Sequence, residues 1–289
     1  MAPTAESLSA DVSRQQQSVM TDLEQQAVVK LRKLLAEQNV AVRNDTDFNL
    51  LRWCQASKLK PDVSLVHDIR LYEENCAALG VENDGHLERW KQYSTFFDLR
   101  THYFCFSNVV AQAKNHKSNA HVVYLLRVAD LNFHKLARVM PVSSLVRTIY
   151  EFNEHNKQAM LRVEQETGQR LSLQLVLDLA DVNIMDYVNP MGTAIQLLRC
   201  VAQVGDRFYP EVVTRTYLVN PPAILSLVWE VAKRVTSERS ANSIVIVPNA
   251  GALREHISLN ALPPCYGGTL KDETGWTDPG LGVCRLPKT

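Results

Sequence analysis

The residues that could carry out chemistry are few and widely spaced. Asp178 and Asp181 follow a predicted strand, where α/β enzymes often keep catalytic carboxylates, but no His, Ser or metal-ligand partner stands at a recognisable spacing from them. Capping of the next helix is therefore the favoured role for this pair. Glu151 and His155 are four residues apart, which favours a surface pair on a helix, because a metal site would need further ligands.

Longer catalytic motifs are absent from the sequence. It contains no G-x-S-x-G elbow, no H-E-x-x-H, no Walker loop and no G-x-G-x-x-G after a strand. The six cysteines are scattered, with no C-x-x-C, which argues against zinc. No signal peptide and no membrane span are predicted, so we expect reduced thiols and a cytoplasmic location. We predict a protein that is not an enzyme and that has no metal or cofactor.

The charge balance bears on the choice of partner. Acidic and basic residues number 31 each, so the formal net charge is zero. Nucleic-acid binding needs a basic surface, and we therefore expect no nucleic-acid partner. A chain of 289 residues is long enough for one large domain or two small ones. We expect a monomer.

Hydrophobic periodicity predicts a helical part followed by an α/β part. Helices are predicted over residues 19–37, after the Asn44–Asp47 cluster and from Pro61 to Leu79. Further on, strands alternate with helices, which predicts a mostly parallel sheet with right-handed crossovers. The strands are expected near 104–106 and over 121–128, 171–179, 214–220 and 243–247, and the helices from 141, over 189–205, after 222 and near 253. The predicted domains are a disordered leader (1–18), a helical unit (19–95), an α/β domain (96–272) and a tail (273–289).

The helix that follows Pro221-Pro222 has apolar residues almost all the way round. Such a helix must be covered on both sides or must itself cover something apolar. Two interpretations remain open from the pattern alone: a buried crossover helix, or a lid over an apolar ligand. In the second case an apolar slot would lie between this helix and one face of the sheet.

Strict alternation along residues 171–178 suggests which side chains would enter that slot. Leu171, Leu173, Leu175 and Leu177 share one face, which we expect to pack on helices. The opposite face would then line the slot with apolar side chains and with a few polar side chains, which we call the polar points. Its expected members are Val176, Tyr217 and Val219, with Ser172 and Gln174 as the polar points.

Five short segments of the sequence form a set of motifs in a fixed order. They are Leu50-Leu51-Arg52-Trp53-Cys54-Gln55-Ala56-Ser57-Lys58-Leu59, Val176-Leu177-Asp178-Leu179, Arg207-Phe208-Tyr209-Pro210-Glu211, Val219-Asn220-Pro221-Pro222 and Leu262-Pro263-Pro264-Cys265-Tyr266-Gly267-Gly268-Thr269. These motifs resemble those of the Sec14-like (CRAL-TRIO) family of lipid-binding proteins. Their order and spacing hold from about residue 46 to 272, and five in register are specific although each is modest alone. The last motif is similar to the animal branch, which includes tocopherol- and squalene-associated proteins. That branch often adds a GOLD domain, which we expect this chain to lack.

The resemblance implies a helical unit packed on an α/β domain that holds one lipid under a mobile gate, the helix after Pro222. The implied action is transfer or presentation of that lipid during transient docking on a membrane surface, with no bond made or broken. The alternative is a regulatory or scaffold module that binds a protein partner such as a small GTPase. The predicted pocket and gate residues are Tyr124, Leu126, Ser172, Gln174, Val176, Ile195, Leu198, Ala202, Tyr217, Val219, Ile224, Leu225, Val228 and Val231.

The resemblance also bears on the headgroup of the ligand. In family members that bind phosphatidylinositol, a basic residue a few positions after Tyr-Pro-Glu helps to hold the headgroup, and Arg215 matches it in charge. A solvated charge at the start of a strand is the alternative for this residue. Gln55 and Ser57 stand where the family has arginines, which weakens phosphate recognition. The expected ligand is a phospholipid, a tocopherol, a sterol-like molecule or an isoprenoid.

Overall fold

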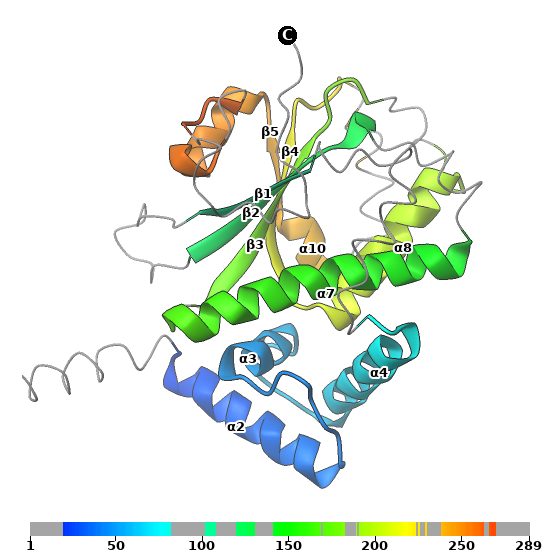
Figure 1. The fold of residues 1–289 in the computed structure, drawn as a ribbon, viewed down its shortest axis with the longest axis vertical. Coiled ribbons are helices and arrows are strands. Elements are labelled where there is room, and N and C mark those ends of the chain that lie inside the picture. Colours follow the sequence, from blue (N-terminus) through cyan, green and yellow to red (C-terminus); the bar gives the residue numbers. More distant parts are fainter. Residues whose placement is uncertain are drawn as a thin grey trace, which may run out of the picture.

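The fold is an α/β sheet with an additional group of helices at the amino-terminal end (Figure 1). The computed structural model describes residues 20–81, 102–107, 120–130, 141–168, 170–182, 189, 191–223, 225, 229, 238–262 and 266–269. The helices are α2 (Asp22–Glu37), α3 (Asp47–Ala56), α4 (Val63–Leu79), α7 (Val142–Thr167), α8 (Thr193–Phe208) and α10 (Glu238–Asn242), with short 3-10 helices η2 (Val128–Asp130), η4 (Ala250–Glu255) and η5 (Leu259–Ala261). The strands are β1 (His102–Ser107), β2 (Ala120–Arg127), β3 (Leu171–Asp178), β4 (Val213–Val219) and β5 (Ile244–Val247).

Local side chains explain where the first helices begin and end. Thr21 and Glu24 form a capping box at the start of α2, and the Asp62 carboxylate accepts a hydrogen bond from a backbone N–H at the start of α4. α4 stops at Gly80, whose φ of 59° is the left-handed conformation that glycine adopts without strain. Gly168 ends α7 in the same way.

The five strands follow one another in chain order across the sheet. β2, β3, β4 and β5 are parallel, and β1 is an antiparallel strand at the edge. Each parallel pair needs a crossover connection, and right-handed crossovers in a sheet of this order all fall on the same face. α7 and α8 accordingly cover one face, and α10 lies beside the end of α8 (Figure 1).

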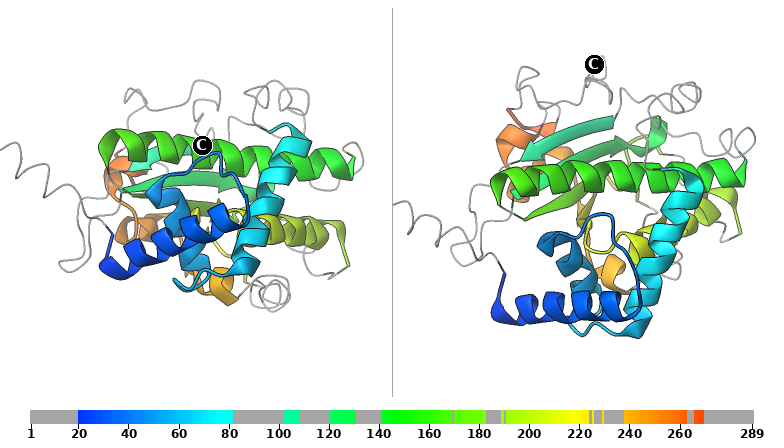
Figure 2. Two further views of the ribbon diagram at one scale, coloured as in Figure 1. Left: turned by 90° about the horizontal axis from the view of Figure 1, so that it is seen from below. Right: turned by 60° about the horizontal axis from the view of Figure 1, so that its bottom comes forward.

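The amino-terminal helices lie against α7, on the side of α7 that faces away from the sheet (Figure 2). One apolar cluster joins them to the α7/α8 face of the sheet. Its members include Leu31, Leu50 and Ile69 from the helices and Leu171 and Leu173 from β3. This arrangement buries both sides of α7, because the helix contacts the sheet on one side and the amino-terminal helices on the other.

The opposite face of the sheet is covered by the segment that comes after β5. A second apolar cluster joins Val176, Tyr217 and Val219 to Leu253 and Leu262. In Figure 1 this segment, with η4 and η5, lies across the sheet from α7. The two clusters are separated by the sheet itself.

The predicted α/β architecture with a mostly parallel sheet is confirmed. Two details differ: the helix expected near residue 253 is the 3-10 helix η4, and one edge strand is antiparallel. Most of the helix predicted after Pro222, like the predicted leader and tail, lies outside the described residues. Among the residues that are described, no helix has both the length and the apolar character needed to cross a bilayer.

Candidate functional site

Helix α8 has apolar residues on two opposite sides. At about 100° per residue, Cys200, Val204 and Phe208 share one side, and these three belong to the first apolar cluster. Ile195, Leu198 and Ala202 lie on the opposite side, within about 60° of one another. Ile195 is fully buried, yet none of these three residues belongs to either cluster of described residues. A helix of this kind requires an apolar neighbour on both sides.

A row of branched apolar side chains crosses the carboxyl end of the sheet. Leu126 pairs with Leu177, Leu177 with Leu218, and Leu218 with Ile246. Register partners point to the same face of a sheet, and here it is the face covered by α7 and α8. Leu126 packs against the first cluster, but Leu177, Leu218 and Ile246 belong to neither described cluster. Leu218 is 8% exposed and Ile246 is 48% exposed.

We call Leu177, Leu218, Ile246, Ile195, Leu198 and Ala202 the carboxyl-edge group. α8 starts after the carboxyl end of β3, so its first half lies towards the edge where the row of side chains lies. Ligands of open α/β sheets bind outside the carboxyl ends of the strands. An apolar group there, outside both clusters of described residues, is suited to contact with an apolar ligand and offers no group for acid–base or nucleophilic chemistry.

The register divides the predicted pocket residues between the two faces of the sheet. Tyr124 and Leu126 point to the α8 face, whereas Val176, Tyr217 and Val219 point to the other face and pack in the second cluster. Successive strand residues alternate, so no single slot on one face takes in both sets. Of the helical residues, Ile195, Leu198 and Ala202 lie in the carboxyl-edge group and Leu225 is buried. Ile224, Val228 and Val231 lie outside the described residues.

The predicted polar points, Ser172 and Gln174, are both buried on the face opposite α8. The Gln174 side-chain oxygen is buried without a hydrogen-bond partner among the described part of the chain. Its register partner on β4 is Arg215, which is exposed. Arg215 therefore shares the face of Tyr217 and Val219, and it is separated by the sheet from the carboxyl-edge group.

Gln55 and Ser57, which replace the family's arginines, both make hydrogen bonds within the protein. The Gln55 side chain donates to Glu24 Oε1 at 3.2 Å and accepts from Arg170 Nη2 at 2.5 Å. Ser57 Oγ donates to the Cys54 carbonyl at 2.9 Å. The two Gln55 contacts join α3 to α2 and to Arg170, the residue before β3, whereas the Ser57 bond is local to the end of α3.

Asp178 and Glu151, which were singled out for their chemistry, have structural partners. Asp178 does more than the expected local capping: besides the N–H of Ala180, its carboxylate accepts from Asn220 Nδ2 at 2.8 Å and from the Tyr266 hydroxyl at 2.6 Å. Glu151 was expected on the surface but is buried, and its carboxylate forms an ion pair with Arg147 at 3.0 Å. Three or more His, Cys, Asp or Glu side chains placed to hold a metal ion do not occur together among the described residues.

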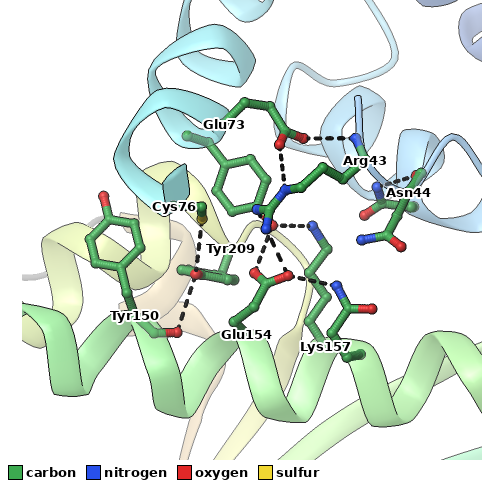
Figure 3. Close-up of polar contacts among 11 residues, drawn as sticks. Arg43, Asn44, Glu73, Cys76, Tyr150, Glu154, Lys157 and Tyr209 are labelled. Atoms are coloured by element: carbon green, nitrogen blue, oxygen red, sulfur yellow. Dashed lines mark hydrogen bonds and ion pairs between the residues drawn. The ribbon is translucent and has the colours of Figure 1, made fainter. Parts of the chain in front are cut away.

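A buried polar network joins α4 to α7 (Figure 3). The Tyr72 hydroxyl donates to Glu154 Oε2 at 2.6 Å and accepts from Lys157 Nζ at 3.0 Å, and the Lys157 ammonium lies 4.4 Å from the centre of the Tyr72 ring. Arg43 pairs with Glu73 at 2.6 Å and lies 3.9 Å from Glu154. Tyr72, Glu154 and Lys157 are all nearly inaccessible to solvent, so this network can hold two units together but cannot receive a substrate.

The ionisation of this network supports a structural role. Burial lowers the pKa of Lys157, although the Glu154 charge opposes that shift. Burial alone would raise the pKa of Glu154, but the Lys157 charge and hydrogen bonds from Tyr72 and Gln158 outweigh it, and the pKa is lowered. Burial also raises the pKa of the Cys76 thiol to about 11, so this thiol is protonated and unreactive at neutral pH.

A second buried contact ties the amino-terminal helices to the sheet. Arg52 forms a bidentate ion pair with Glu164 of α7, and Arg52 also donates to the Leu171 carbonyl at 2.8 Å. The Leu171 N–H in turn donates to Glu164 at 2.7 Å. Arg52 is the arginine of the Leu-Leu-Arg motif, and this contact gives that motif a structural function.

The comparisons with known proteins agree with this architecture. Residues 106–268, more than half of the chain, match the model of the CRAL/TRIO domain. The CRAL-TRIO domain-containing protein C34C12.6 of Caenorhabditis elegans is 27% identical over 89% of this chain and 66% of its own length. The phosphatidylinositol/phosphatidylcholine transfer protein SFH13 of Arabidopsis thaliana is 22% identical over 92% of this chain, but only 43% of that relative is covered.

A solved structure has the same fold. The crystal structure of Sfh5 superposes with a TM-score of 0.58 and 16% identity, and the match covers 89% of this chain and 90% of that one. A match over 89% of this chain must include both the sheet and the amino-terminal helices. The chain therefore belongs to the CRAL/TRIO family.

Proposed function

We propose that this protein binds a single hydrophobic lipid at the carboxyl-edge group and transfers or presents it between membranes, with no covalent bond made or broken. The observation that carries the proposal is the second apolar side of α8, with Ile195, Leu198 and Ala202 outside both cores. This side of α8 lies on the same face of the sheet as the apolar row that includes Leu177 and Leu218. The chain also contains a CRAL/TRIO domain. The ligand-holding domain is proposed to extend over 96–272 and the supporting helical unit over 19–95.

We further propose that the helix after Pro222 is the gate of this site. Its sequence is apolar almost all the way round, and Leu225, at its start, is buried although it belongs to neither described cluster. The gate would cover the ligand in the cytoplasm and would open during transient contact with a membrane surface. A lid of this kind removes the ligand from water for the time that it is carried.

Neutral lipids are the proposed ligand class. Gln55 is uncharged and its side chain is hydrogen-bonded to Glu24 and Arg170, so it does not supply the charge-assisted donors that an arginine offers to a phosphate. Arg215 lies on the sheet face opposite the carboxyl-edge group. A tocopherol, a sterol-like molecule or an isoprenoid fits these surroundings better than a phosphoinositide.

Native mass spectrometry of the purified protein, followed by organic extraction, tests the proposal. One bound species of lipid mass, which also moves between donor and acceptor vesicles, would support it. A bound phosphoinositide would contradict the neutral-ligand assignment. A protein that remains empty after incubation with mixed vesicles would overturn the carrier function and favour a regulatory module that binds a protein.

Leu225→Asp is expected to abolish transfer while the domain stays folded. A charge at this buried position opposes closure of the gate, because an isolated carboxylate is strongly disfavoured in apolar surroundings. Val29→Asp is the matched control, since Val29 is 65% exposed on α2. Circular dichroism would establish folding and vesicle exchange would give the rate. An unchanged transfer rate in the Leu225 variant would eliminate the gate assignment.

A further inference from the structure

We infer that the Thr216 hydroxyl determines the specificity of the proposed ligand site, and that the ligand is a neutral lipid with a hydroxyl at one end. This inference rests on the proposed function and narrows the ligand class within it. Thr216 lies on β4, and its register partner on β3 is Leu175. Because Leu175 packs against the first cluster, Thr216 faces α7 and α8, as does Leu218 two residues later.

A β-bulge decides which residue of β4 occupies this position. Leu173 pairs with Val213, and the register then shifts by one residue, because Thr214 has no register partner among the described residues of β3. Pairing without this shift would place Arg215 on the face of α8. With the shift, Arg215 points to the opposite face and Thr216 takes that place. The bulge therefore puts a neutral hydroxyl where a guanidinium would otherwise border the carboxyl-edge group.

The Thr216 hydroxyl is not used by the fold. The residue is only 9% exposed, and its side chain makes no hydrogen bond to any part of the chain that the structure describes. Its backbone N–H does have a partner, the Ser243 carbonyl at 3.1 Å. A hydroxyl that is removed from water without a partner destabilises the folded protein. This hydroxyl is therefore available to a bound molecule that can pair with it.

The neighbours of Thr216 connect it to the carboxyl-edge group. Its register partner on β5 is Ile244, which belongs to neither described cluster. Leu218 and Ile246, both in the carboxyl-edge group, lie two residues further along the same two strands and on the same face. Two residues along a strand correspond to roughly 6–7 Å. Thr216 thus lies at the border between the first cluster and the proposed site.

The chemistry of a threonine hydroxyl indicates which polar group it would bind. It is both a donor and an acceptor, and so is the hydroxyl of a lipid alcohol, so the two can pair in either direction. A hydrocarbon would leave Thr216 unpaired, and a phosphate would lack the charge of Arg215, which points to the other face. The lipid hydroxyl would therefore lie at Thr216, with the apolar chain along Leu218 and Ile246.

Thr216→Val tests this assignment, because it removes the hydroxyl and keeps the branched shape of the side chain. The probes are two matched pairs, dihydrophytol with phytane and cholestanol with cholestane, in which the alcohol and the hydrocarbon share one carbon skeleton. Each pair is offered in equal amounts in phosphatidylcholine vesicles, and the lipid bound to the re-isolated protein is quantified by mass spectrometry. We expect the wild-type protein to prefer the alcohol, and Thr216→Val to lower that preference roughly fivefold.

Two further variants separate this role from a structural one. Thr216→Ser keeps a hydroxyl and should retain the preference. Ser57→Ala also removes a half-buried hydroxyl, but from the end of α3 in the amino-terminal unit, and should bind like the wild type. In the lipid-free form, Thr216→Val should not lower the free energy of unfolding, because no hydrogen bond is lost. A merely structural hydroxyl would give lower stability and an unchanged ratio of alcohol to hydrocarbon.

The negative outcomes distinguish this inference from the proposed function. A preference for the alcohol that survives in Thr216→Val would overturn the role of Thr216 and leave the carrier function intact. A wild-type protein that takes lipid from the vesicles without preferring either alcohol would have the same meaning. A wild-type protein that takes up no lipid at all would overturn the proposed function, and this inference with it.

Discussion

The two faces of the sheet differ in what covers their apolar side chains at the carboxyl ends of the strands. On one face, Val176 and Val219 are sealed by Leu253 and Leu262 of the segment after β5. On the other, Leu218 lies between Tyr217 and Val219 in the sequence but belongs to neither described cluster. Side chains of similar apolarity therefore serve a folding core on one face and a candidate ligand site on the other. Residue type alone does not separate these two roles.

The difference arises from how the chain is connected. Strands in sequential order place every right-handed crossover on one face, and α10, at the end of the connection from β4 to β5, lies beside the end of α8. The opposite face is free to be closed by the segment after β5. Gly268 packs so closely on the Leu262 backbone that any β-carbon there would clash with the carbonyl, which explains the glycine at this position of the Tyr-Gly-Gly-Thr motif. Backbone packing of this kind keeps the segment after β5 close to Leu262, which belongs to the second cluster.

The largest expected effect is a loss of stability when a core side chain is removed from the face covered by the segment after β5. Leu253→Ala should reduce the free energy of unfolding by about 2–5 kcal/mol, because Leu253 is fully buried in the second cluster and its removal leaves a cavity. Lipid affinity per folded molecule should change little. Urea unfolding measures the first quantity, and lipid binding below the unfolding midpoint measures the second.

Leu259→Ala is the control for that experiment, since Leu259 is a leucine in the same segment but is 44% exposed. Its effect on unfolding should stay within about 0.5 kcal/mol. A loss of lipid affinity in the Leu253 variant as large as its loss of stability would mean that the sealed face also contributes to the ligand site. The comparison between the two faces would then be invalid.

Leu218→Ala should show the converse pattern, with its main effect on the ligand. Removal of about three apolar carbons from a lipid contact costs roughly 2 kcal/mol, or about thirtyfold in Kd. The lipid-free protein should lose less stability than in the Leu253 variant, because Leu218 is in neither core cluster of described residues. Titration with the extracted lipid gives the affinity. Wild-type affinity in this variant would place the ligand elsewhere.

Much of the fold could be predicted from local patterns. The alternation of residues 171–178 predicted the two faces of β3, and the register confirms that Leu171, Leu173 and Leu175 point towards the helices. Gly80 was predicted to end a helix, and its left-handed φ confirms this prediction. Such features depend on neighbours within a few residues, which a single sequence contains.

The assignment of a face to the ligand could not be predicted in the same way. Val176 and Tyr217 were assigned to the slot because they alternate with the helix-facing leucines, and this assignment stays a prediction. Which face a crossover covers depends on strand order and crossover handedness. Leu177 was placed on the helix-facing side with Leu171, Leu173 and Leu175 by the same alternation, but it is not a member of the first cluster of described residues. The Asp178–Asn220 contact joins residues that are distant in the chain, so no local pattern indicated it.

The smallest expected effect is also the sharpest test of the two faces, because it compares adjacent residues of one short strand. Ile246 is 48% exposed on the α8 face, whereas Val247 is buried in the second cluster. Ile246→Ala should change the free energy of unfolding by no more than about 0.5 kcal/mol. It should weaken lipid binding only severalfold, since half of the side chain already faces solvent. Val247→Ala should lower the free energy of unfolding by about 1.5 kcal/mol, at roughly 0.8 kcal/mol for each buried carbon removed, and should leave lipid binding unchanged.

The reverse result, with Val247 controlling affinity and Ile246 controlling stability, would move the ligand to the face of Val176 and Tyr217. Since both variants lie on one edge strand, a general weakening of β5 would change both measurements in both proteins and would be recognised as such.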